Sequence, residues 1–131
     1  MPARGGGMEI FMIIKESAEN YLETILVLKN KKGNVRSIDV AHELMVSKPS
    51  VSVAMKHFRE DGYIVVETDG SISLTEKGLN VAERVYERHQ VITKALMSIG
   101  VDEITAKEDA CKIEHDISET TFEKLKEYIE K

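Results

Sequence analysis

The spacing of apolar positions near the N-terminus predicts a helix. Between Ser17 and Lys29 these positions recur at helical intervals, at Tyr21, Leu22, Ile25, Leu26 and Leu28. Ser17, followed by Asn20 and Glu23, offers N-cap chemistry, and Gly33 is expected to end the helix. The short apolar run of residues 10–14 could extend this helix toward the N-terminus, and periodicity alone leaves that open.

Two shorter helices follow, separated by a tight break. Ser37 can cap the first, whose apolar face consists of Ile38, Ala41 and Leu44. Ser47 and Pro49 mark the start of the second, because Ser is a good N-cap and the missing N–H of Pro costs nothing in a first turn. This helix is expected to reach about Asp61, with its inward face at Val51, Met55 and Phe58.

After Gly62 the pattern changes to that of a hairpin. Residues 63–67 are rich in β-branched side chains, residues 68–71 contain an Asp-Gly turn, and residues 72–74 alternate as a returning strand. A long helix is expected from about Thr75 to Ile99, and two more between Asp102 and Glu130 with a break near Ser118. Three helices, a hairpin and further helices are the order of a winged helix-turn-helix domain with a helical extension.

The overall charge balance opposes binding to a polyanion. The 131 residues include 18 Lys and Arg against 23 Asp and Glu, a formal net charge of −5. The charge is unevenly distributed, because the segment from Lys29 to Glu60 holds seven basic and three acidic residues, whereas the segment from Ser98 to the end holds ten acidic residues and five lysines. The predicted helix-turn-helix is therefore locally basic, as phosphate contacts require.

The remaining composition excludes several classes of protein. The longest apolar runs are far shorter than the roughly 20 residues of a membrane-spanning helix. Residues 1–7 lack the apolar core of a signal peptide and are expected to form a flexible leader, with Met8 as an alternative start. Cys111 is the single cysteine, so no internal disulfide can form, which suits a cytoplasmic location.

The start of the predicted third helix is the candidate DNA-reading surface. Its small hydroxyl side chains allow close approach to a groove, its N-terminus favours phosphate, and Val53 could contact a thymine methyl group. The candidate contacts to double-stranded DNA are Arg36, Ser47, Lys48, Pro49, Ser50, Ser52, Val53 and Lys56. The alternative is that the same helix-and-hairpin fold serves protein contacts and that its charges are only solvated.

The segment Cys111-Lys-Ile-Glu114-His115 carries the metal-binding hypothesis. Positions i, i+3 and i+4 share one face of a helix, so a thiolate, a carboxylate and an imidazole can converge there. Such a mixed donor set suits Fe(II), Mn(II), Co(II), Ni(II) or Zn(II) better than Ca(II) or Mg(II). Further candidate ligands are Asn20 and Glu23 on the first helix and His89 on the long helix. Taken singly, each of these residues is also compatible with an ordinary structural or surface role.

With these residues in place, the chain resembles the metal-dependent repressors of the diphtheria toxin repressor family, which includes iron-dependent regulators and manganese transport regulators. The resemblance runs from Ser17 to about Lys131 and rests on Ala18–Ile25, Ser47–Ser52, Asp61–Tyr63, Leu74–Gly78, Arg88–His89 and Ala110–Ser118. The motif Leu74–Gly78 is common to many winged-helix families. The combination of Cys-x-x-Glu-His with an upstream His and an N-terminal Asn-Tyr-Leu-Glu is much more specific.

The resemblance implies a cytoplasmic homodimer that represses transcription by binding a palindromic operator when Fe(II) or Mn(II) is bound. It places Cys111, Glu114, His115 and His89 at family ligand positions, and Glu23 at a ligand position of the manganese branch. Asn20 stands where the iron branch has Met and the manganese branch has Asp. Because Cys111 follows the iron branch, Fe(II) is expected first and Mn(II) second, with Zn(II), Co(II) or Ni(II) binding in vitro.

The resemblance also implies departures. Thr93 replaces a carboxylate and Lys107 replaces a histidine of the second metal site of the iron branch, and the SH3-like third domain is missing. The resulting prediction is a mainly α fold with a small β wing. Residues 1–75 form the winged helix-turn-helix domain, and residues 76–131 form a helical metal-binding and dimerisation domain.

Two other functions remain open at this point. A winged-helix regulator that senses a small ligand would show no effect of metal on DNA affinity. A small metalloenzyme could use Glu114 as a general base beside a bound metal, although no nucleophile or phosphate-binding loop accompanies the cluster.

Overall fold

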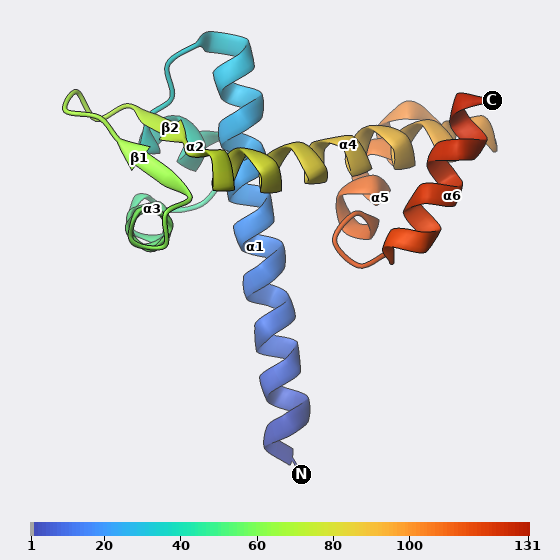
Figure 1. Ribbon diagram of the computed structural model, residues 1–131, viewed down its shortest axis with the longest axis horizontal. Coiled ribbons are helices and arrows are strands. Elements are labelled where there is room, and N and C mark those ends of the chain that lie inside the picture. Colours follow the sequence, from blue (N-terminus) through green and yellow to red (C-terminus); the bar gives the residue numbers. More distant parts are fainter. Residues whose placement is uncertain (1) are drawn as a thin grey trace. The chain divides into compact units, whose positions relative to one another are not determined.

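Residues 2–131 of the computed structural model form six helices and a two-stranded hairpin (Figure 1). For residues 2–14 only the course of the first helix is described, and side chains are described from Lys15 onward. The elements are α1 (Pro2–Lys32), α2 (Ser37–Leu44), α3 (Lys48–Glu60), β1 (Ile64–Val66), β2 (Ile72–Leu74), α4 (Glu76–Ser98), α5 (Glu103–Ile113) and α6 (Glu119–Glu130). They form two compact units, Met1–Glu83 and Arg84–Lys131, so that α4 contributes to both.

The first unit is a winged helix whose core includes the apolar faces predicted for α1 and α3. The face predicted for α2 is partly wrong, because Ile38 is exposed and Val40 is buried beside Ala41. Leu22, Ile25 and Leu28 of α1 are buried. The other buried members of this core are Val35, Val40, Ala41, Val51, Met55, Phe58, Ile64, Ile72 and Ala82. Each large apolar side chain buried in this way contributes about 1.5–3 kcal/mol, so the core dominates the energy that holds α1, α2, α3 and the hairpin together.

Helix α1 is longer than predicted, because it begins at Pro2 and includes residues 10–14. Ser17 therefore lies inside the helix, and its prediction as an N-cap is wrong. No Gly or Pro interrupts the chain between Met8 and Asn30, so nothing opposes continuation through Ser17. Gly33 ends α1 as predicted, with φ +82° and its N–H donating to the Lys29 carbonyl at 2.9 Å. The leader predicted at residues 1–7 lies outside the residues whose side chains are described.

The starts of α2 and α3 use different capping groups. Arg36, not Ser37, takes the N-cap position of α2, and its N–H donates to the Asp39 carboxylate at 2.8 Å. A carboxylate three residues into the helix supplies this bond in place of the predicted serine cap. The Lys32 ammonium, 2.7 Å from Asp39, lowers the pKa of that carboxyl group. Ser47 caps α3 as predicted, because its Oγ accepts from the Ser50 N–H.

The hairpin forms the wing. Strands β1 and β2 pair antiparallel with Val66 opposite Ile72, and Gly70 at the turn has φ +88°. The Ile72 N–H donates to the Val35 carbonyl at 2.7 Å, so the loop after α1 contacts the start of β2, next to the turn of the wing. Helix α4 begins immediately afterwards, because the Thr75 hydroxyl accepts from the Gly78 N–H.

In the second unit, the C-terminal part of α4 packs with α5 and α6. The buried apolar residues are Val85, Ile92, Ala95, Ala106, Ala110 and Phe122. Asp102 caps α5 and Ser118 caps α6, each side chain accepting a backbone N–H three residues later. Among the residues that the structure describes, no helix combines the length and apolarity needed to cross a bilayer.

Candidate metal centre and nucleic-acid interface

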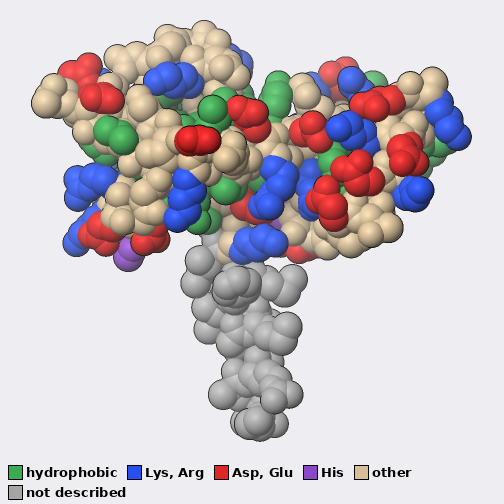
Figure 2. Space-filling model, in the orientation of Figure 1, with side chains coloured by type: hydrophobic (Ala, Val, Ile, Leu, Met, Phe, Trp, Pro, Cys, Tyr) green, Lys and Arg blue, Asp and Glu red, His purple; other side chains and the backbone are tan. Residues whose placement is uncertain are grey.

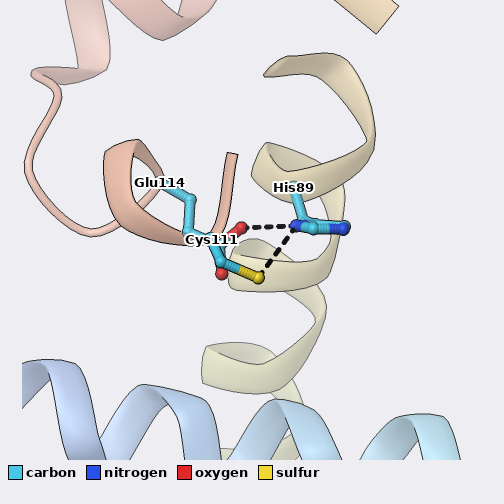
Figure 3. A group of neighbouring side chains, drawn as sticks. All are labelled: His89, Cys111 and Glu114. Atoms are coloured by element: carbon cyan, nitrogen blue, oxygen red, sulfur yellow. Dashed lines mark hydrogen bonds and ion pairs between the residues drawn. The ribbon is translucent and has the colours of Figure 1, made fainter. Parts of the chain in front are cut away.

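Three of the six predicted ligands converge in the second unit. His89 lies on α4, Cys111 lies in the last turn of α5, and Glu114 is the first residue after α5. The three side chains point toward one another (Figure 3). One ligand atom from each residue lies within 4.8 Å of the other two. His89 Nδ1 is 2.9 Å from Glu114 Oε2 and 3.8 Å from Cys111 Sγ. A nitrogen, a sulfur and an oxygen therefore surround one point.

The ligand motif does not lie on one continuous helix, as its spacing predicted. Helix α5 ends at Ile113, and Glu114 is the C-cap residue. Glu114 keeps helical backbone angles, φ −57° and ψ −24°, so its side chain stays beside Cys111 one turn earlier. His115 follows in the turn, where its Nε2 lies 3.5 Å from Glu114 Oε1, the oxygen that faces away from His89. The structure thus places His115 against Glu114 rather than within the three-residue cluster.

The electrostatics of the cluster depend on Glu114. This carboxylate is 1% exposed, and its Oε1 makes no hydrogen bond to any described residue. A buried carboxylate is costly unless a positive charge and hydrogen bonds compensate it. Hydrogen bonds from the His89 imidazolium to Cys111 and to Glu114 raise the pKa of His89 from 6.5 to about 10. The position is therefore one in which a positive charge is stabilised, and the N, S and O donors suit a divalent first-row transition metal.

The remaining two predicted ligands lie in the first unit. Asn20 and Glu23 are half-buried on α1, and each makes interactions of its own. Their role as ligands therefore depends on the sequence pattern alone. The two departures from the iron branch are both visible in the second unit. The buried Thr93 hydroxyl has no hydrogen-bond partner among the described residues, and the Lys107 ammonium pairs with Glu103 at 2.9 Å.

One residue of the site was not anticipated from the sequence. Arg88 entered the sequence analysis only as part of the matching stretch Arg88–His89, and its side chain is 12% exposed. It donates to the carbonyl oxygen of Glu114 at 3.2 Å and to that of Ile117 at 3.0 Å. Its position next to His89 in the sequence was the only available signal. Its acceptors are main-chain carbonyl oxygens, which every residue has, so no residue type in the sequence marks these contacts.

The candidate DNA-reading surface is formed by α2, α3 and the wing. On α3 the inward positions Val51, Met55 and Phe58 are buried, and the predicted contacts on the other positions are exposed: Lys48, Pro49, Ser50, Ser52, Val53 and Lys56. Ser47 is also exposed, and its Oγ donates to Ser50 Oγ at 2.9 Å. Figure 2 shows Lys and Arg side chains around the α3 end of this unit, interspersed with acidic ones.

Arg36, the N-cap residue of α2, lies close to the turn of the wing. Its Nη1 lies 3.0 Å from the position that a Cβ on Gly70 would occupy. The carboxyl group of the neighbouring Asp69 accepts from the hydroxyl and N–H of Ser71, which lowers its pKa, and the Arg36 charge lowers it further. Arg36 therefore lies beside the wing turn as well as at the start of α2.

Comparison with known proteins supports both halves of this description. A model of the N-terminal DNA-binding domain of iron-dependent repressors matches residues 14–72, and a model of their metal-binding and dimerisation domain matches residues 75–131. The chain belongs to the iron-dependent repressor family. This family consists of DNA-binding transcriptional regulators and not of enzymes, so the metalloenzyme alternative is set aside.

Individual relatives agree with this assignment. An uncharacterised HTH-type transcriptional regulator of Methanocaldococcus jannaschii is 35% identical over 90% of this chain and 96% of its own length. The HTH-type transcriptional regulator MntR of Lysinibacillus sphaericus is 32% identical over 87% of this chain and 82% of its own. The structure of the manganese regulator SloR superposes with a TM-score of 0.76 at 25% identity, over 86% of this chain and 53% of that one. The chain thus spans about half the length of this solved relative.

Proposed function

We propose that the chain is a homodimeric repressor that binds operator DNA when Fe(II) or Mn(II) is held by His89, Cys111 and Glu114. It would thereby adjust transcription to the supply of the metal in the cytoplasm. The single observation that supports this most is the convergence of the three ligand atoms within 4.8 Å, inside the segment that matches the metal-binding and dimerisation domain. In this proposal residues 1–75 bind DNA and residues 76–131 bind metal and form the dimer.

The unsatisfied carboxylate oxygen of Glu114 fits a cation. A bound divalent ion supplies the positive charge that the Glu114 carboxylate and the Cys111 thiolate require as a counter-ion. His115, which contacts Glu114, is proposed as a further ligand. Asn20 and Glu23 are proposed as ligands from the first unit on sequence grounds, with Asn20 offering only a neutral carbonyl oxygen.

Cys111 supports Fe(II) ahead of Mn(II). A thiolate is a softer ligand than a carboxylate, and Mn(II) is the harder and more weakly bound of the two ions. The solved relative that is described as a manganese regulator keeps Mn(II) as the second candidate. Zn(II), Co(II) and Ni(II) are proposed to bind in vitro only.

For DNA, the proposed contacts are the exposed residues at the start of α3, together with Arg36 beside the wing. In a dimer, two α3 helices would occupy successive major grooves about 34 Å apart, as in other helix-turn-helix dimers. The proposed dimer surface lies in the second unit, where several large apolar side chains are exposed: Met97, Ile99, Ile104 and Tyr128.

The proposal is tested by metal-dependent DNA binding. Duplexes are selected from a random library with the Mn(II)-loaded protein, and affinity is then measured by fluorescence anisotropy with Mn(II), with anaerobic Fe(II) and with chelator. Glu114→Ala and His115→Ala should abolish the effect of metal without altering the helical content seen by circular dichroism. Lys107→Gln, at an ion-paired surface position, is the matched control and should behave as wild type. Equal affinity with metal and with chelator would overturn the proposal.

Metal preference has its own test. Cys111→Glu replaces the thiolate by a carboxylate and should shift the activation of DNA binding from Fe(II) toward Mn(II). An unchanged order of the two metals in that variant would remove Cys111 as the basis for proposing iron.

A further inference from the structure

Two consecutive residues of α4 contact Glu114, one at its side-chain carboxylate and the other at its main-chain carbonyl oxygen. His89 contacts the side-chain carboxylate through Nδ1, 2.9 Å from Oε2. Arg88 donates from Nη1 to the main-chain carbonyl oxygen of the same residue at 3.2 Å. The carboxylate of Glu114 is thus fixed through its own hydrogen bond and also through the backbone that carries it.

The backbone at Glu114 needs such a partner because α5 has just ended. The last carbonyl oxygens of a helix receive no hydrogen bond from an N–H of the same helix, and only five residues separate α5 from α6. Arg88 Nη1 donates to the Ile117 carbonyl at 3.0 Å as well as to Glu114, so one guanidinium bridges the start and the end of the turn. A positive charge at this position also interacts favourably with the C-terminal end of the α5 dipole.

The guanidinium is itself held by α6. Its Nη2 donates to Glu119 Oε2 at 2.9 Å, and its central carbon lies 5.3 Å from the centroid of the Phe122 ring. Glu119 is in the first turn of α6, and Phe122 is buried one turn later. The fixed fork of an arginine can make these bonds together, which the single ammonium of a lysine cannot.

We propose that Arg88 is a positioning residue of the metal centre. It fixes the backbone of the turn after α5, so that the Glu114 carboxylate and the adjacent His115 side chain each keep one orientation. Glu119 and Phe122 keep the guanidinium in place. This inference rests on the proposed metal-binding function, which it extends to a residue that contacts no metal.

Co(II) binding to the full chain provides the test, because its absorption reports both affinity and ligand geometry. Arg88→Gln should weaken Co(II) binding about 10–100-fold, the usual effect of losing a group that orients ligands, and should change the visible d–d bands. Arg88→Lys should recover at most part of the affinity. The matched control is Lys126→Gln, which removes another contact between α4 and α6, the 3.5 Å ion pair with Glu87, and should bind Co(II) as wild type does.

The possible outcomes separate the two proposals. If wild-type protein binds Co(II) and Arg88→Gln binds it with the same affinity and spectrum, the role of Arg88 is refuted and the metal centre stands. If wild-type protein binds no Co(II), the metal centre itself is refuted. Should Arg88→Gln not fold, Glu119→Gln replaces it, since it loosens the guanidinium from the exposed side; an unchanged affinity and spectrum there would also refute the inference. A loss equal to that of Lys126→Gln would show that only the packing of α6 matters.

Discussion

The protonation of His89 should make metal binding strongly dependent on pH. In the metal-free protein, Cys111 and Glu114 raise the pKa of His89 to about 10. The nitrogen that faces both residues is Nδ1, and a histidine nitrogen can bind a metal only after losing its proton. Metal therefore competes with a proton that these two side chains hold tightly.

The size of the effect follows from that pKa. Raising the solution from about pH 6.5 to about pH 8.5 increases the neutral fraction of His89 about 100-fold, since each pH unit below the pKa is a factor of ten. Apparent metal affinity should rise by about the same factor.

The stability of the metal-free fold should change in the opposite direction. The pKa of His89 is higher in the folded than in the unfolded chain, so protonation stabilises the fold fully below about pH 6.5. This contribution is lost as the pH rises through about 10. A metal-free sample should therefore become less stable over the same range in which its affinity for metal increases.

Two measurements check this reasoning. NMR titration of the imidazole signals in the presence of chelator, with His89→Gln used to assign the resonance, should give a midpoint well above that of a free histidine. Mn(II) titrations at constant ionic strength should give an affinity that increases with pH across the same range. A midpoint near 6.5, or an affinity that does not change with pH, would refute the electrostatic description of the cluster.

Three further predictions concern the first unit, and chemical denaturation measures the stability in each case. Met45→Gly should stabilise the protein by about 0.5–1 kcal/mol, because Met45 has φ 56° and its side chain is 91% exposed. Relief of the left-handed backbone strain should exceed the conformational-entropy cost of Gly, and a loss of stability would contradict this. Gly78→Ala should destabilise by about 1–3 kcal/mol, because its Cβ would meet the carbonyl oxygen of Tyr63; an unaltered midpoint would show that α4 does not approach so closely. Ser47→Ala should cost about 1 kcal/mol and weaken DNA binding, whereas Ser47→Asn should keep the cap and the stability.

The fold was predictable where local chemistry and burial agree. The inward faces of α1 and α3 combine helical spacing with burial in the core. The Ser47 cap and the Asp-Gly turn of the wing follow from strong local preferences alone. The prediction failed where two local signals competed. Ser17 can cap a helix, yet its neighbours continue one, and Ser37 can cap α2, yet the Asp39 carboxylate two residues later already serves the Arg36 N–H.

The site was predictable only as far as side-chain identity determines it. Cys111, Glu114 and His89 could be named because a thiol, a carboxylate and an imidazole are recognisable ligands at a recognisable spacing. The contacts of Arg88 could not, because its acceptors at Glu114 and Ile117 are backbone carbonyls, which every residue carries. The pairing of His115 with the second oxygen of Glu114 also depends on where α5 ends, which spacing does not give.

The end of α5 explains why the spacing of Cys-x-x-Glu-His is not sufficient to build the centre. On a continuous helix Cys111, Glu114 and His115 would share a face without outside help. Because α5 stops at Ile113, the helix itself orients only Cys111 and, through its retained backbone angles, Glu114. The remaining order comes from α4, through His89 on the carboxylate and Arg88 on the carbonyl. A chain with the same motif but without an arginine at position 88 should therefore bind metal more weakly, although its metal ligands would be unchanged.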